Sequence, residues 1–151
     1  MSVRAQSARE IELPRFTVTV DREELRRFAR ATGDDDPRSI DVEAAAAAGH
    51  RDLPLPSTYL FSLELRRPDP YAVLDVLGLD RGQMLHGEQS FTYLATCVAG
   101  DTLTFSPRMT DDYVRKGGAL RFLERETTVE RDGGTVAVLR NVLVVRQAVS
   151  A

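Results

Sequence analysis

The chain has little of what several classes of protein require. It contains one cysteine, Cys97, and two distant histidines, which excludes an intrachain disulfide and leaves no ligand spacing for a metal site. No apolar run approaches the roughly 18 residues of a membrane span, and the first residues lack the apolar stretch of a secretory signal. We therefore expect a protein of the reducing cytoplasm, without a metal.

A surplus of positive charge is also missing. The 20 lysines and arginines face 23 acidic residues, for a formal net charge of −3, which argues against nucleic-acid binding. With 151 residues, 42% of them hydrophobic, the chain is long enough to bury the core of one compact domain. We expect an irregular N-terminal segment over residues 1–14 and a single domain over residues 15–151.

The first half of the chain favours helices. A short alternating strand over residues 15–20 precedes a helix that Asp21 caps and Gly33 ends. A second helix is expected over residues 41–49. The segment 53–67 holds a helix that is apolar almost all round, which predicts burial.

The second half favours strands. Long strands are expected over residues 83–98, 102–116, 120–131 and 135–146, with a tight turn at 99–101 and a hairpin turn at 131–134. A strand, then helices, then four strands indicates the α+β class, with an antiparallel sheet wrapped around a central buried helix.

Three successive carboxylates, Asp34 to Asp36, follow the end of the first helix and precede Pro37. Acidic residues beside a glycine and a proline are typical of a solvated turn in which the carboxylates accept from backbone N–H groups. The same residues suit a catalytic loop if Asp34 has a partner that transfers protons.

Three motifs together resemble one family. They are "RRFARATGDDDP", "AAAAAGH" and "LHGEQSFTYLATCVAGDTLT". In this order they resemble the MaoC-like (R)-specific hydratases and dehydratases, which have the hot-dog fold, and especially their N-terminal, FAS1-like dehydratase branch. The chain is also similar to the non-catalytic subunits of heterodimeric β-hydroxyacyl dehydratases.

The resemblance implies a catalytic aspartate and histidine five positions apart on one loop. The aspartate position is Asp34, whereas the histidine position holds Ser39. A serine hydroxyl does not titrate near neutral pH, so Ser39 cannot replace imidazole as an acid or base. His86 is the alternative source of an imidazole, although a structural histidine is the favoured interpretation.

The resemblance also implies an oxyanion hole at the start of the buried helix. Backbone N–H groups there stabilise the enolate-like oxygen of a thioester, and the candidates are Ser57, Thr58 and Tyr59.

The predicted function is therefore the substrate-holding half of a heterodimeric 3-hydroxyacyl-thioester dehydratase or (R)-specific enoyl-thioester hydratase. The expected partner is a homologous hot-dog subunit with an intact Asp/His dyad. The substrate is an acyl-CoA or an acyl carrier protein thioester, and no cofactor, nucleic acid or membrane is implied. Three alternatives stay open: a homodimeric dehydratase using Asp34 with His86 or water, a hot-dog thioesterase, and a non-enzymatic acyl-binding scaffold subunit.

Overall fold

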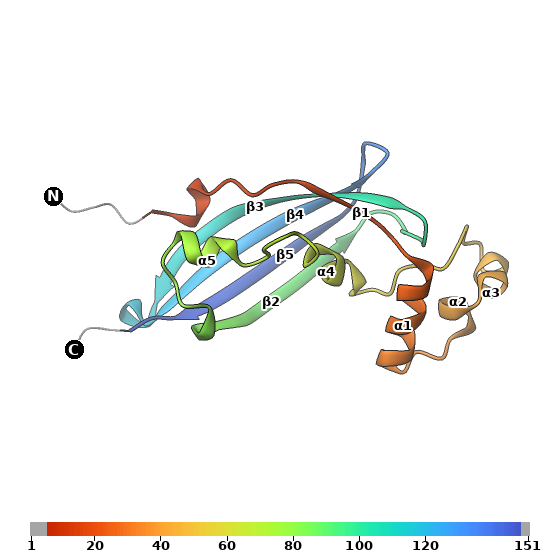
Figure 1. Ribbon diagram of the computed structural model, residues 1–151, viewed down its shortest axis with the longest axis horizontal. Coiled ribbons are helices and arrows are strands. Elements are labelled where there is room, and N and C mark those ends of the chain that lie inside the picture. Colours follow the sequence, from red (N-terminus) through yellow and green to blue (C-terminus); the bar gives the residue numbers. More distant parts are fainter. Residues whose placement is uncertain (1–5, 149–151) are drawn as a thin grey trace.

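The computed structural model describes residues 6–148, in which five antiparallel strands form one sheet in the order β1-β3-β4-β5-β2 (Figure 1). The strands are β1 (Phe16–Thr19), β2 (Met84–Tyr93), β3 (Thr102–Arg115), β4 (Leu120–Arg131) and β5 (Gly134–Arg146). The helices are α1 (Arg22–Thr32), α2 (Pro37–Ile40), α3 (Val42–Ala47), α4 (Tyr59–Glu64) and α5 (Ala72–Val76), with short 3-10 turns η1 (Ala8–Glu10), η2 (Arg81–Gln83) and η3 (Lys116–Gly118). The first five residues of the predicted segment 1–14 and the last three of the predicted domain lie outside the described residues.

The helix α4 lies across one face of the sheet, so the predicted α+β hot-dog arrangement is confirmed (Figure 1). Its residues Leu60 and Leu63 are fully buried in the main apolar core, as the pattern predicted. The helix occupies only six residues of the segment 53–67, because Pro54 and Pro56 hold the residues before it out of the helix. Pro54 instead forms a β-bridge with Val98.

The helix α1 has the predicted ends. The Asp21 carboxylate accepts from the N–H of Glu24 at 2.9 Å, and Gly33 closes the helix with a left-handed backbone, φ 72°. The helices α1, α2 and α3 gather at one end of the molecule (Figure 1). Within residues 6–148 no helix has the length and apolar character that would span a membrane.

The strand β2 contains a bulge that the sequence pattern did not predict. The pairing with β5 shifts between His86 and Glu88, which makes Gly87 the extra residue. A Cβ atom on Gly87 would lie 2.7 Å from the Val144 side chain, so any other residue would force its neighbours to shift. Because of the shift, His86 and Gln89 both face the side of the sheet that α4 covers.

Candidate functional site

The acidic loop after α1 uses its carboxylates to fold the backbone. The Asp34 carboxylate accepts from the N–H of Asp36 at 3.1 Å, and the Asp36 carboxylate accepts from the N–H of Arg38 at 2.9 Å, which caps α2. Hydrogen bonds from the Arg38 side chain and backbone lower the pKa of Asp36 to about 2. Asp36 therefore remains a carboxylate at neutral pH.

In the part of the chain that the structure describes, no histidine lies within ion-pair distance, 4.0 Å, of the Asp34 carboxylate. Ser39, at the position where the family motif has histidine, lies within α2, and no ion pair joins a described histidine to a carboxylate. The His86 ring instead packs on Phe61 at 4.9 Å between ring centroids, and its Nε2 atom lies 2.7 Å from the Asn141 amide nitrogen. His86 and Asp34 therefore do not form a proton-transfer pair here.

The start of α4 offers fewer free backbone donors than the sequence analysis expected. The Tyr59 N–H donates to the Pro56 carbonyl at 3.1 Å. Thr58 occupies the N-cap position but makes no capping bond with its side chain. Among residues 6–148 the N–H groups of Ser57 and Thr58 have no hydrogen-bond partner, so these two remain the candidates for binding an oxyanion.

The Tyr59 side chain connects α4 to α1. Its hydroxyl donates to the Glu24 carboxylate at 3.2 Å and accepts from Arg66 at the same distance, while its ring packs edge-on against Phe28. Burial raises the pKa of Tyr59, so its hydroxyl stays protonated and donates. Tyr59 thus fixes how α4 sits against α1, the helix that carries the acidic loop.

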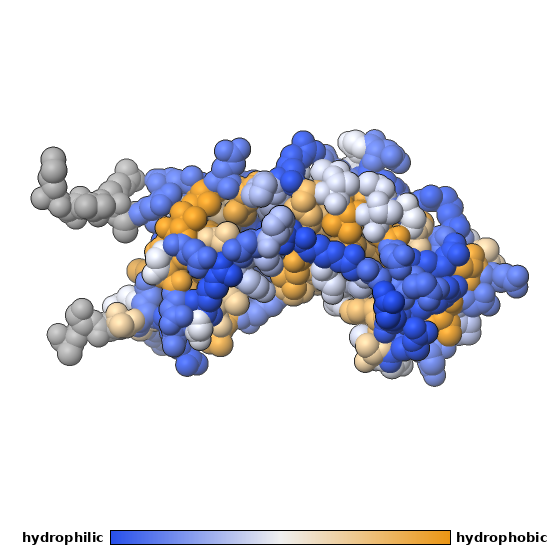
Figure 2. Space-filling view, in the orientation of Figure 1, coloured by the Kyte–Doolittle hydropathy of each residue, from blue (hydrophilic) through white to orange (hydrophobic). Residues whose placement is uncertain are grey.

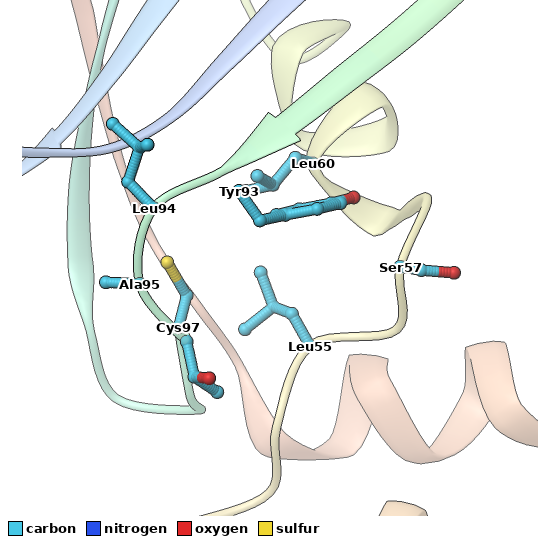
Figure 3. A pocket seen from close by; sticks show the side chains of 8 residues that line it. Leu55, Ser57, Leu60, Tyr93, Leu94, Ala95 and Cys97 are labelled. Carbon is cyan, nitrogen blue, oxygen red and sulfur yellow. The ribbon is translucent and has the colours of Figure 1, made fainter.

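A cavity of about 420 Å³ opens beside the start of α4, and Figure 3 shows the side chains around it. It is lined by Leu55, Ser57, Leu60, Tyr93, Leu94, Ala95, Thr96 and Cys97. The Leu55 side chain points toward the Tyr93 ring, whereas the Ser57 hydroxyl points away from both (Figure 3). This predominantly apolar wall beside free N–H groups suits a ligand with a hydrocarbon chain and one polar end.

Cys97 contributes to the cavity as an apolar group. Burial raises the pKa of its thiol, so the nucleophilic thiolate is disfavoured at neutral pH. Its backbone carbonyl accepts from the N–H of Leu55 at 3.0 Å and so joins two walls of the cavity. Cys97 is therefore a free, buried thiol that serves packing.

Sequence reasoning missed a group of buried polar residues between α4 and the sheet. Glu64, Arg125 and Asn141 each expose 2% of their surface or less. Arg125 on β4 lies opposite Asn141 on β5 in the strand register, and the Arg125 Nε atom donates to the Glu64 carboxylate at 3.0 Å. The available signal was the presence of a charge or an amide at core-facing positions of otherwise apolar elements.

Comparison with known proteins agrees with this architecture. The family model described as "FAS1-like, dehydratase domain region" matches residues 8–139. A UPF0336 protein of Clavibacter michiganensis is 39% identical over 127 residues, covering 84% of this chain and 85% of that protein. A UPF0336 protein of Leifsonia xyli is 40% identical over 133 residues, with the same coverage.

Solved structures show the same fold. A chain of the HadBC (3R-hydroxyacyl-ACP dehydratase) complex from Mycobacterium tuberculosis superposes with a TM-score of 0.75 at 26% identity, over 93% of this chain and 98% of that one. A chain of the ChsH1-ChsH2 complex from the same organism superposes with a TM-score of 0.72 at 20% identity, over 91% and 85%. The chain thus belongs to the family of FAS1-like dehydratase domains, whose members are MaoC-like hot-dog proteins.

Proposed function

We propose that the chain is the substrate-holding, non-catalytic subunit of a two-subunit 3-hydroxyacyl-thioester dehydratase, or of the (R)-specific enoyl-thioester hydratase that runs the reverse reaction. Hydration needs a base to take a proton from water, and an acid to return one to the α-carbon. In this proposal the partner subunit supplies both through an intact Asp/His pair. The cytoplasm remains the expected compartment.

The main support is the composition of the acidic loop. Asp34 keeps its position after α1, but Ser39 replaces the titrating ring, and one oxygen of the Asp34 carboxylate accepts from the backbone of its own loop. A carboxylate without an adjacent imidazole lacks the second proton-transfer group that the reaction uses.

The cavity beside α4 supports the substrate-holding part. Its apolar wall would accommodate an acyl chain, and in this proposal the N–H groups of Ser57 and Thr58, which have no hydrogen-bond partner among residues 6–148, bind a thioester oxygen as it gains negative charge. Backbone donors do not depend on side-chain identity. The proposal therefore keeps this element in a subunit that has serine in place of the histidine.

The edge strand β2 supports a hot-dog partner. It has ten residues, with β5 on one side and no strand among residues 6–148 on the other. Leu85, Tyr93 and Leu94, on or just after β2, expose 47%, 47% and 61% of their surface. A long strand edge with apolar side chains favours pairing with another chain, and the similar HadBC and ChsH1-ChsH2 structures are complexes of two named components.

The test is to purify the tagged chain from its native host and identify what accompanies it. We expect a similar-length subunit with an intact Asp/His motif, and hydration of enoyl-CoA by the complex. Substituting the partner's histidine should abolish turnover, whereas Asp34→Asn in this chain should leave most of it. Release of free thiol would favour the thioesterase, and a complex that binds acyl thioesters without turning them over would favour the scaffold.

A further inference from the structure

The sheet has a second face, opposite α4 and α5, which we call the outer face. In Figure 1 the two helices lie in front of the sheet, and in the same view Figure 2 shows apolar side chains gathered over α5. The outer face is therefore the one turned away from the viewer. In an antiparallel sheet such a face normally carries polar side chains, because it meets water.

One line of apolar side chains crosses the outer face from β3 to β2. Each of the strands β3, β4, β5 and β2 contributes one residue, and the four lie opposite one another in the strand register: Tyr113, Phe122, Val144 and Leu85. Successive side chains along a strand point to opposite faces. Leu123 and Leu143, next to this line in sequence, are buried in the core with residues of α5, so the line itself points outward. We call these four residues the apolar row.

The apolar row is partly exposed and already ordered. The Tyr113 and Phe122 rings stack with 5.0 Å between their centroids and 3° between their planes, and the Arg115 guanidinium lies 4.5 Å from the centroid of the Tyr113 ring. Leu85, at the β2 end, exposes 47% of its surface. Because these side chains hold one another in place, a second surface can cover them at little cost in conformational entropy.

Charges of opposite sign lie on the two sides of the apolar row. On one side Glu124 and Glu88 share a single arginine, Arg140, at 2.7 and 3.2 Å, which leaves a surplus of negative charge. On the other side Arg115 and Arg146 occupy the next outward-facing positions of β3 and β5, and neither forms an ion pair with a residue among 6–148. The outer face thus has an acidic side and a basic side, with the apolar row between them.

We propose that the outer face packs against the outer face of a second copy of this chain, related to the first by a two-fold axis along the apolar row. This axis places the row of one copy on the row of the other. The same rotation brings the acidic side of each copy over the basic side of the other, where opposite charges attract. Two sheets packed in this way lie about 10 Å apart. The pairing uses outward side chains and leaves the backbone edge of β2 free, so the inference does not depend on the proposed function.

The test is sedimentation equilibrium of the purified full chain and of two variants with a substitution on β4. Phe122→Lys places a charge within the apolar row, and we expect it to weaken self-association by at least about tenfold. Thr128→Lys is the control, because Thr128 also faces outward on β4 but lies about 20 Å along the strand, beyond the region that the two copies share. We expect this variant to associate as the wild-type chain does.

A charge exchange tests the orientation of the two copies. Arg146→Glu brings acidic groups together across the interface and should weaken association by about tenfold. Combining Arg146→Glu with Glu88→Arg restores opposite charges across the interface and should recover most of the association. Both side chains are exposed, so these variants report on the interface even if Phe122→Lys does not fold.

Three results would overturn the proposal. A wild-type chain that stays monomeric would show that a second copy does not cover the outer face. A folded Phe122→Lys variant that associates like the wild-type chain would exclude the apolar row from the contact. Failure of the double charge variant to recover association would exclude the two-fold arrangement.

Discussion

Individual residues in the interior show the difference between a paired and a surplus charge. Arg125 neutralises Glu64 at 3.0 Å, and both groups are almost fully buried. Arg67 lies nearby, and its Nη1 atom has no hydrogen-bond partner among residues 6–148. Breaking a buried pair leaves an uncompensated charge, whereas removing a surplus ion relieves a desolvation cost.

We therefore expect opposite effects of the same substitution at these two arginines. Arg125→Met should lower the free energy of unfolding by about 3 kcal/mol, while Arg67→Met should raise it by about 1 kcal/mol. Equilibrium unfolding in urea, followed by circular dichroism, measures both. Equal destabilisation by the two variants would show that Arg67 takes part in the pair after all.

The residue scale is also where the sequence was least informative. The helix caps Asp21 and Gly33 were predictable because each acts on its neighbours in the chain. The contact of Glu64 with Arg125 joins residues 61 positions apart, and only the packing of α4 on β4 creates it. For the same reason, the sequence could locate Ser39 in the motif but not show what surrounds Asp34.

Among the structural elements, β2 depends most on one residue. Gly87 forms the bulge, and a Cβ atom there would lie 2.7 Å from the Val144 side chain and 3.2 Å from the Val142 carbonyl. The order of the strands along the chain was predictable from the alternation of apolar and polar residues and from the turns between them. A single extra residue in a paired strand leaves no comparable pattern in the sequence.

Gly87→Ala should lower the free energy of unfolding by about 2 kcal/mol, because the sheet must shift to admit the methyl group. The matched control is Gly134→Ala at the start of β5, where the nearest atom would lie at an ordinary 3.6 Å. Thermal unfolding of the two variants compares them. A Gly87→Ala variant as stable as the control would mean that the bulge tolerates a side chain.

The turn between β2 and β3 depends on Asp101, which accepts from the Val98 N–H at 2.9 Å and pairs with Arg131 and Arg51. Burial acts to raise the pKa of Asp101, but the hydrogen bonds from Val98 and the arginines outweigh it, and the pKa is lowered overall. A lowered pKa in the folded state means that the carboxylate stabilises the fold above the unfolded pKa, and that this contribution is lost as the pH falls through the folded pKa.

Asp101→Asn should therefore cost about 2 kcal/mol of unfolding free energy at pH 7, and the difference from wild type should shrink below about pH 4. Urea unfolding at pH 7, 5 and 3 provides the comparison. A difference that stays constant over this range would show that the charge of Asp101 has no part in stabilising the turn.

At the scale of the whole molecule, β2 is an edge strand of the sheet, and the proposed function requires a second subunit there. Leu85→Lys on β2 should weaken association with the partner by at least about tenfold, because it places a charge in an apolar interface. Val114→Lys, on β3, which two strands separate from β2, should not, although Val114 has a similar 50% exposure. Sedimentation velocity of the complex distinguishes these results. Equal association of both variants with the partner would show that β2 is not part of the interface.

The central claim is that this chain alone lacks the pair of groups that moves protons, although it holds the substrate. The most direct measurement is the rate at which the purified chain, free of any partner, hydrates an enoyl-CoA. We predict binding without turnover above the uncatalysed rate. Sustained turnover by the chain alone, abolished by Asp34→Asn, would contradict the account and identify a self-sufficient dehydratase.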